Sequence, residues 1–111
     1  MSAVSAVTTH VLDTARGVPA AGMAVRLELI TAAGPAELGR ARTGDDGRIG
    51  DLGPAALEPG TYRLVFDTGG YLGGDAFFPE AAVTFRIDGR AGHYHVPLLL
   101  SPFGYSAYRG S

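Results

Sequence analysis

Bulky apolar residues alternate with polar ones in short segments along the chain, and glycine or proline separates these segments. Successive side chains of a β-strand point to opposite faces, so this alternation is typical of strands with one buried face. The pattern predicts about eight short strands and at most one short helix, which fits only between residues 67 and 79. The clearest expected strands span residues 7–12, 23–30, 37–43, 61–66, 82–87, 92–100 and 104–108.

Turn signals join these segments. Residues 14–19 lie between the first two strands, Ala33-Gly34-Pro35 predicts a hairpin turn, and Asp45-Asp46-Gly47 provides a tight turn before Arg48. The glycine-rich run at residues 69–74 lacks the order and the lysine of a phosphate-binding loop, so we interpret it as a connection. Many short strands separated by turns predict an all-β sandwich or barrel.

Length and composition restrict the organisation of the chain. A chain of 111 residues, 46% hydrophobic and 18% charged, is expected to form a single globular domain over residues 1–111. There is no cysteine, which excludes disulfides, thiolate metal sites and cysteine nucleophiles.

Charge argues against a polyanionic partner. The net charge is −2, and the nine basic residues, all arginine, form no cluster, so we expect no nucleic-acid binding. Residues 1–7 contain no basic segment followed by a long apolar one, and no stretch approaches membrane-spanning length. A soluble cytoplasmic protein without a membrane partner is therefore expected.

Two of the three histidines lie in the expected strand near the C-terminal end. The period of two divides this strand into a uniformly bulky face, which we assign to the core, and an opposite face that carries both histidines. The core face holds Tyr94, Val96, Leu98 and Leu100, and the outer face holds His93, His95, Pro97 and Leu99.

The first and last strands show a related pattern. Thr8, His10 and Leu12 share the less bulky face of the first strand, and Ser106, Tyr108 and Gly110 are in phase in the last. If these strands are neighbours in one sheet, His10, His95, Ser106 and Tyr108 line a common surface. Leu12 and Leu99 make that surface partly apolar, which indicates that another subunit covers it.

Histidine is the commonest general base, but each of the three also has an ordinary explanation. We interpret His93 as a surface or hydrogen-bonded residue, whereas a functional and a structural role stay equal alternatives for His10 and His95. The spacing of His93 and His95, with His10 as a third ligand, also permits a zinc site. The sequence shows no carboxylate or other partner that would orient histidine ligands of this kind, so we expect no metal.

Five ordered motifs give the chain a resemblance to a known family, the transthyretin-like 5-hydroxyisourate hydrolases. They are Thr-Thr-His-Val-Leu-Asp at residues 8–13 with Gly17 and Pro19, Thr-Gly-Asp-Asp-Gly-Arg at 43–48, Phe-Phe-Pro-Glu at 77–80, His-Tyr-His-Val-Pro-Leu-Leu-Leu-Ser-Pro at 93–102 and Tyr-Arg-Gly-Ser at 108–111. The resemblance covers nearly the whole chain. Ala107 stands where the family pattern has threonine.

This resemblance implies a transthyretin-like (prealbumin) sandwich of two four-stranded sheets with one short helix. It implies a homotetramer whose central channel holds the active sites between subunits. It also implies that His10, Arg48 and His95 are catalytic, and that Tyr108, Arg109, Ser111 and Ser106 bind the substrate. Pro97 fits poorly in an internal strand, because it lacks a backbone donor, so we expect a local bulge there.

The implied reaction is the hydrolysis of 5-hydroxyisourate, a purine-derived small molecule, to 2-oxo-4-hydroxy-4-carboxy-5-ureidoimidazoline in urate degradation, without a cofactor. One of His10 and His95 would deprotonate water while the other hydrogen-bonds the substrate, and Arg48 would stabilise the oxyanion. The alternative is a non-enzymatic carrier of a small ligand, of the transthyretin type. The three catalytic positions weigh against it, because the carrier has other residues there.

Overall fold

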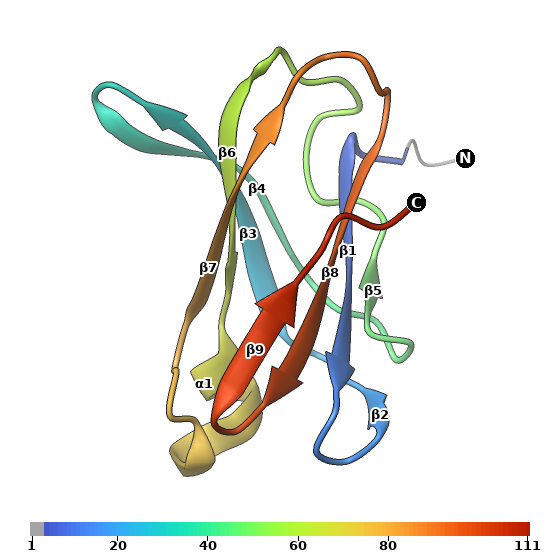
Figure 1. Cartoon of the computed structure of the whole chain (residues 1–111), viewed down its shortest axis with the longest axis vertical. Helices are drawn as coiled ribbons and strands as arrows, with labels where there is room; N and C mark the ends of the chain where they lie inside the picture. The colour runs from blue at the N-terminus through green and yellow to red at the C-terminus, as the bar shows by residue number, and fades with distance from the viewer. Residues whose placement is uncertain (1–3) are drawn as a thin grey trace.

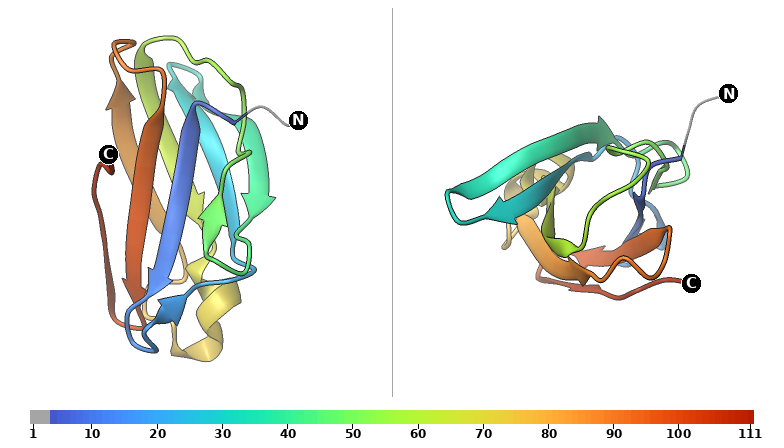
Figure 2. Two further views of the ribbon diagram at one scale, coloured as in Figure 1. Left: turned by 90° about the vertical axis from the view of Figure 1, so that its right-hand side faces the viewer. Right: turned by 90° about the horizontal axis from the view of Figure 1, so that it is seen from above.

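The computed structural model describes residues 4–111. The expectation of no signal sequence concerns residues 1–7, and residues 1–3 of that segment lie outside the described residues. The chain forms two facing sheets, which Figure 2 shows as two layers. The first sheet contains β1 (Val7–Asp13), β2 (Val18–Pro19), β5 (Arg48–Ile49), β8 (Tyr94–Ser101) and β9 (Gly104–Ala107), and the second contains β3 (Ala24–Thr31), β4 (Gly34–Arg42), β6 (Gly60–Phe66) and β7 (Ala81–Ile87).

The order of the first sheet is β2-β1-β8-β9, and β5 also pairs with β1. Both two-residue strands lie along one edge of β1: β2 pairs with Leu12 and Asp13, whereas β5 pairs with Thr9 and His10. The first sheet has five strands but is at most four strands wide at any level, and the second sheet has the order β4-β3-β6-β7. The predicted transthyretin-like sandwich is confirmed, with β2 and β5 as short additions that the alternation pattern is too brief to reveal.

The core lies between the sheets and follows the predicted phase. Val7, Thr9 and Val11 of β1 are fully buried, and the predicted core face of β8 is buried along its length. Burying apolar surface stabilises the fold by about 25 cal/mol for each Å². The more apolar face of each strand therefore points inward. The histidines are consequently on the outer face of the first sheet.

Pro97 lies in β8 without the expected bulge. The parallel register of β1 with β8 runs without a shift from Val7 opposite Tyr94 to Asp13 opposite Leu100, and the antiparallel register with β9 is also regular. The prediction of a bulge is therefore wrong. The backbone N–H and C=O groups of odd-numbered residues in β8 point toward β9 and the C-terminal tail, since Gly110 N donates to His95 O. The missing donor of Pro97 therefore falls where the β9 pairing ends, at Ala107.

A short helix, α1 (Thr68–Leu72), and a 3-10 turn (Gly73–Asp75) connect β6 to β7, inside the predicted window. Figure 1 shows them at the lower end of the sandwich. The side chain of Asp67 accepts a hydrogen bond from Gly70 N at the start of α1, and Tyr71 donates to Asp13 of β1 over 2.8 Å. No helix formed by residues 4–111 has the length and apolar character that crossing a membrane requires.

Candidate active site

The turn after β4 brings Arg48 beside His10. Gly47 has a φ of 78°, and a Cβ atom there would overlap the backbone oxygen of Val11, so only glycine lets the turn approach β1 this closely. Val11 N donates to Gly47 O over 2.8 Å, and Arg48 then pairs with His10 in the antiparallel register. Directly opposed residues share a face, so the guanidinium of Arg48 lies on the face that carries the histidine.

The same turn orients the ring of His10. Its Nε2 lies 2.9 Å from the backbone oxygen of Asp46. A carbonyl oxygen only accepts hydrogen bonds, so Nε2 carries the proton and donates it. In neutral His10, the lone pair is therefore on Nδ1.

The parallel pairing of β1 with β8 places Thr8 opposite His95. Thr8 Oγ1 lies 2.8 Å from His95 Nδ1 and also 2.8 Å from His93 Nε2. The two imidazole rings lie nearly parallel, at 28°, with their centroids 6.4 Å apart. Although Thr8 belongs to the outer face, it is only 6% exposed.

The environment of His95 favours its neutral form. Burial lowers the pKa of His95 below its ordinary value, and the positive charge of Arg48 lowers it further, with smaller contributions from His93 and His10. At neutral pH the ring is therefore uncharged and able to accept a proton.

The C-terminal tail continues from β9 along β8, as the red end of the ribbon in Figure 1 shows. Tyr108 N donates to Pro97 O over 3.4 Å, and Gly110 N donates to His95 O over 2.8 Å. Gly110 lies against the histidine ring, since a Cβ atom there would be 2.6 Å from His95 Cδ2. This contact brings Ser111 to the site.

These elements enclose a shallow hollow of about 260 Å³ on the outer face of the first sheet. It is lined by Thr8, Thr9, Arg48, Ile49, Gly50, His93, His95 and Ser111. Three of the predicted site residues thus meet here: Arg48, His95 and Ser111. His10 borders them, because it pairs directly with Arg48. The hollow combines a neutral imidazole with a fixed positive charge, the minimum needed to activate water and stabilise an oxyanion.

Other predicted residues lie apart from this hollow. Ser106 pairs with Leu99, four residues along β8 from His95. Arg109 lies over the ring of Tyr94, 5.1 Å from its centroid, although Tyr94 points to the core face. Tyr108, which is 54% exposed, borders a separate hollow with Arg109 at the edge between β7 and β9.

Thr8 is not among the site residues predicted from the sequence. The signal was present, because Thr8 is in phase with His10 on a face that should be wet. His93 is a hydrogen-bonded residue, in agreement with its predicted structural role, but its partner is the same hydroxyl that holds His95.

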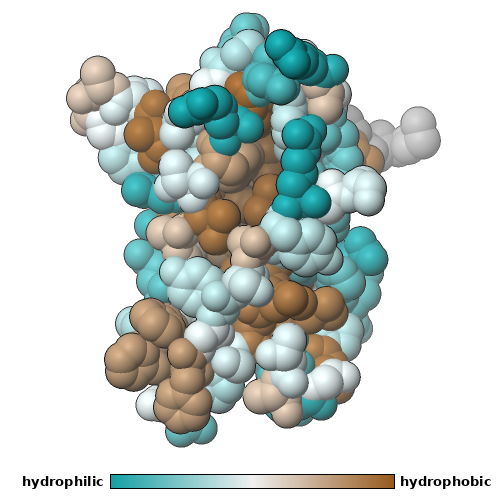
Figure 3. Space-filling view, viewed as in Figure 1, coloured by the Kyte–Doolittle hydropathy of each residue, from teal (hydrophilic) through white to brown (hydrophobic). Residues whose placement is uncertain are grey.

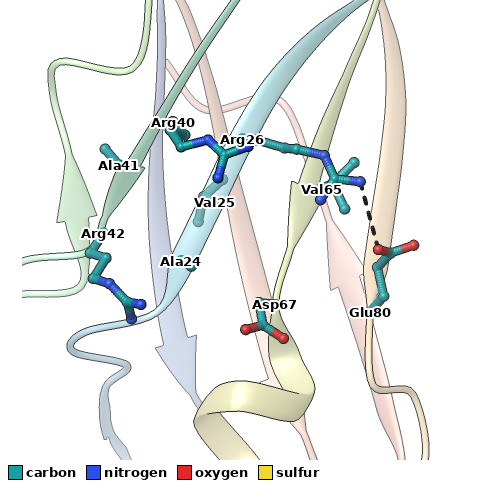
Figure 4. A pocket seen from close by; sticks show the side chains of 9 residues that line it. All are labelled: Ala24, Val25, Arg26, Arg40, Ala41, Arg42, Val65, Asp67 and Glu80. Atoms are coloured by element: carbon teal, nitrogen blue, oxygen red, sulfur yellow. Dashed lines mark ion pairs between the residues drawn. The ribbon is translucent and has the colours of Figure 1, made fainter. Parts of the chain in front are cut away.

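A larger hollow, of about 410 Å³, lies on the second sheet (Figure 4). Arginine and carboxylate side chains line it, and two of its three arginines form ion pairs. Arg26 contacts Glu28 at 3.0 Å and Glu80 at 3.8 Å, and Arg40 forms an ion pair with Glu37. No imidazole lines this hollow, and Arg26 and Arg40 are already engaged in ion pairs, so it lacks the chemistry found on the first sheet.

The histidines do not converge as metal ligands in the described part of the chain. Residues 4–111 contain no group of three or more histidine, cysteine, aspartate or glutamate side chains placed to hold one metal ion. The ring nitrogens of His93 and His95 that lie closest together both face Thr8.

Comparison with known proteins assigns the chain to a family. The model of the HIUase/Transthyretin family matches residues 7–110, and the chain belongs to this family. The 5-hydroxyisourate hydrolase of Mus musculus is 47% identical over 113 residues, covering 96% of both chains. Among solved structures, the Klebsiella pneumoniae 5-hydroxyisourate hydrolase superposes with a TM-score of 0.83 at 36% identity, over 96% of this chain and 100% of that one.

The fold alone does not separate the two branches of the family. Sea bream transthyretin, solved in complex with thyroxine, gives a TM-score of 0.86 at 31% identity, over 95% of this chain and 94% of that one. The distinction between a hydrolase and a carrier therefore depends on the side chains of the site.

Proposed function

We propose that this chain is a hydroxyisourate hydrolase, which converts 5-hydroxyisourate to 2-oxo-4-hydroxy-4-carboxy-5-ureidoimidazoline in urate degradation. The observation that carries this proposal is the hollow in which a neutral His95, Arg48 and Ser111 meet, with His10 beside them. The similarity to hydrolases over nearly the full chain supports it.

In this proposal His95 is the general base. Its Nδ1 is bonded to Thr8 and its Cδ2 faces Gly110, so its far edge, which includes Nε2, points away from the sheet into the hollow. Nε2 removes a proton from water as the oxygen adds to the ring carbonyl carbon. The carbon–nitrogen bond of the lactam then breaks, and the proton is delivered to the leaving nitrogen. The carboxylic acid formed releases its remaining proton to solvent, so the products are a carboxylate and a ureido group, and no cofactor takes part.

The remaining side chains bind and orient the substrate. Arg48 offers a planar set of donors for the oxyanion that forms on the carbonyl oxygen as water adds to the carbon. His10, fixed by Asp46 O, hydrogen-bonds the substrate. Ser111 shapes the pocket, and Arg109 holds the tail in place through Tyr94. Tyr108 borders a separate hollow of the same chain, so it would reach the substrate only from a neighbouring subunit. Ser106 lies too far along β9 for direct contact within one chain, so its binding role would require a neighbouring subunit.

The open shape of the site favours a homotetramer in which other subunits cover it. The half-buried Leu12 and Leu99 on this face would be buried in such an assembly. Large aromatic side chains are also exposed near α1 and the β8–β9 turn, where Figure 3 shows a brown cluster at the lower end. They include Phe77, 69% exposed, and Phe103, 78% exposed. Sedimentation velocity at several protein concentrations measures this assembly. The cytoplasmic location of the protein stays a prediction.

The direct test follows the ultraviolet absorbance of freshly generated 5-hydroxyisourate with and without the protein. We expect acceleration by the wild type, and a loss of at least about 100-fold in kcat/KM for His95→Asn and for Arg48→Glu, with the assembly unchanged. Near-normal turnover by either variant would show that its role is misassigned. A wild-type protein that binds a small aromatic ligand but leaves the absorbance decay unaltered would instead favour the carrier.

A further inference from the structure

One hydroxyl group lies between two imidazole rings beside the active-site hollow. Thr8 Oγ1 is 2.8 Å from both His93 Nε2 and His95 Nδ1, distances typical of hydrogen bonds. Thr8 lies on β1, His95 on the adjacent strand β8, and His93 directly before β8 in the connection from β7. The packing of the core does not require them, because all three side chains point away from it.

The number of protons available restricts this arrangement. A threonine hydroxyl has one proton to donate and two lone pairs, and a neutral imidazole has one donor and one acceptor nitrogen. If His95 Nδ1 donates to Thr8, the hydroxyl proton can go to His93 Nε2, and His95 Nε2 keeps its lone pair. If the hydroxyl instead donates to His95, then Nε2 of His95 carries the proton and cannot accept another.

The surroundings of His95 select the first of these states. The edge of the ring that contains Nε2 faces the hollow, which Arg48 also lines. The positive charge of Arg48 disfavours an N–H bond directed into the same space and favours a lone pair there. Hydrogen bonding at one ring nitrogen sets the protonation of the other, so the hydroxyl controls the state of the base.

We propose that Thr8 is a positioning residue of the reaction, supported by His93. It accepts the Nδ1–H of His95 and donates to His93, and it thereby holds His95 in the one neutral tautomer that can deprotonate water through Nε2. This inference rests on the proposed hydrolase function. It adds two residues whose side chains act on His95 rather than on the substrate.

The test compares Thr8→Val with a matched control, Thr14→Val. Both changes replace a hydroxyl by a methyl group on the β1 side of the β1–β8 pair, and Thr14 Oγ1 bonds to Leu100 O, away from the histidines. We expect Thr8→Val to lower kcat by about 10- to 100-fold with a small change in KM, the usual effect of losing a partner that orients an active group. Thr8→Ser keeps the hydroxyl and should restore activity to within about threefold, and Thr14→Val should match the wild type.

Nitrogen-15 NMR gives a readout independent of turnover, because the chain has only three histidines. We expect wild-type His95 to carry its proton on Nδ1, and Thr8→Val to populate the other tautomer. His93→Leu should shift the same signals less strongly and reduce kcat less. Unchanged His95 signals in Thr8→Val, or wild-type kcat in that variant, would overturn the proposal.

Failure of the function and failure of this inference give different results. A wild-type protein that does not accelerate the decay of 5-hydroxyisourate contradicts the hydrolase, whatever the tautomer. An active wild type whose Thr8→Val variant is equally active contradicts only the role of Thr8. Thermal unfolding of Thr8→Val, Thr8→Ser and His93→Leu verifies that each variant is folded, and the serine variant tests the proposal even if valine is not tolerated.

Discussion

The contact between Gly110 and the ring of His95 makes Gly110→Ala a sharp test of the tail's role. The added Cβ atom would lie 2.6 Å from His95 Cδ2 and 3.4 Å from Pro97 Cγ. Carbon atoms pack at about 3.5–4.0 Å, so the ring or the tail must move by about 1 Å. A displacement of this size at a reacting group costs about 100-fold in rate. We therefore expect kcat/KM to fall by about 100-fold.

The stability of Gly110→Ala should change little, because residue 110 lies in the tail beyond the last strand. We expect a change of about 0.5 kcal/mol or less in the free energy of unfolding, measured in urea. Gly104→Ala is the matched control, since a Cβ atom at Gly104 meets nothing within 4 Å. Turnover is followed by the absorbance of 5-hydroxyisourate. If Gly110→Ala keeps full activity, or if Gly104→Ala loses as much, the tail does not position His95 as described.

Three further predictions follow from the same structure. Because the pKa of His95 is lowered, the base should stay unprotonated and kcat/KM constant from pH 8 to about 6.5, with a fall only at lower pH. A flat profile down to pH 5 would contradict a histidine base. Deleting residues 109–111 removes one hydrogen bond and one cation–π contact, which should lower the free energy of unfolding by only about 1–2.5 kcal/mol. The same deletion should abolish at least 99% of turnover, and equal activity of the truncated chain would refute this. Glu28→Gln should destabilise the fold by about 1–3 kcal/mol at pH 7, because Glu28 accepts from Arg26 and Arg63 over 3.0 and 2.9 Å. Burial raises the pKa of Glu28, but the hydrogen bonds and positive charges of Arg26 and Arg63 together lower it below its ordinary value. The stabilisation is therefore present above about pH 4.5 and is lost as pH falls further; urea unfolding at pH 7 and pH 3 measures the difference.

Local alternation in the sequence determined which face of each strand is buried. The period of two placed Val7, Thr9 and Val11 inside and His10 outside, and the structure has the same phase. This prediction succeeds because core burial depends on side-chain direction, which a strand fixes residue by residue.

The tertiary structure decided which strands are neighbours and in which register they pair. Thr8 and His95 are 87 positions apart, and only the parallel pairing of β1 with β8 brings the hydroxyl to the ring. No local pattern encodes this pairing, because it results from packing both sheets around one core. The sequence alone thus placed His10 and His95 on the outer faces of their strands. The fold joined those faces and gave His95 its bond to Thr8, its contact with Gly110 and the nearby charge of Arg48.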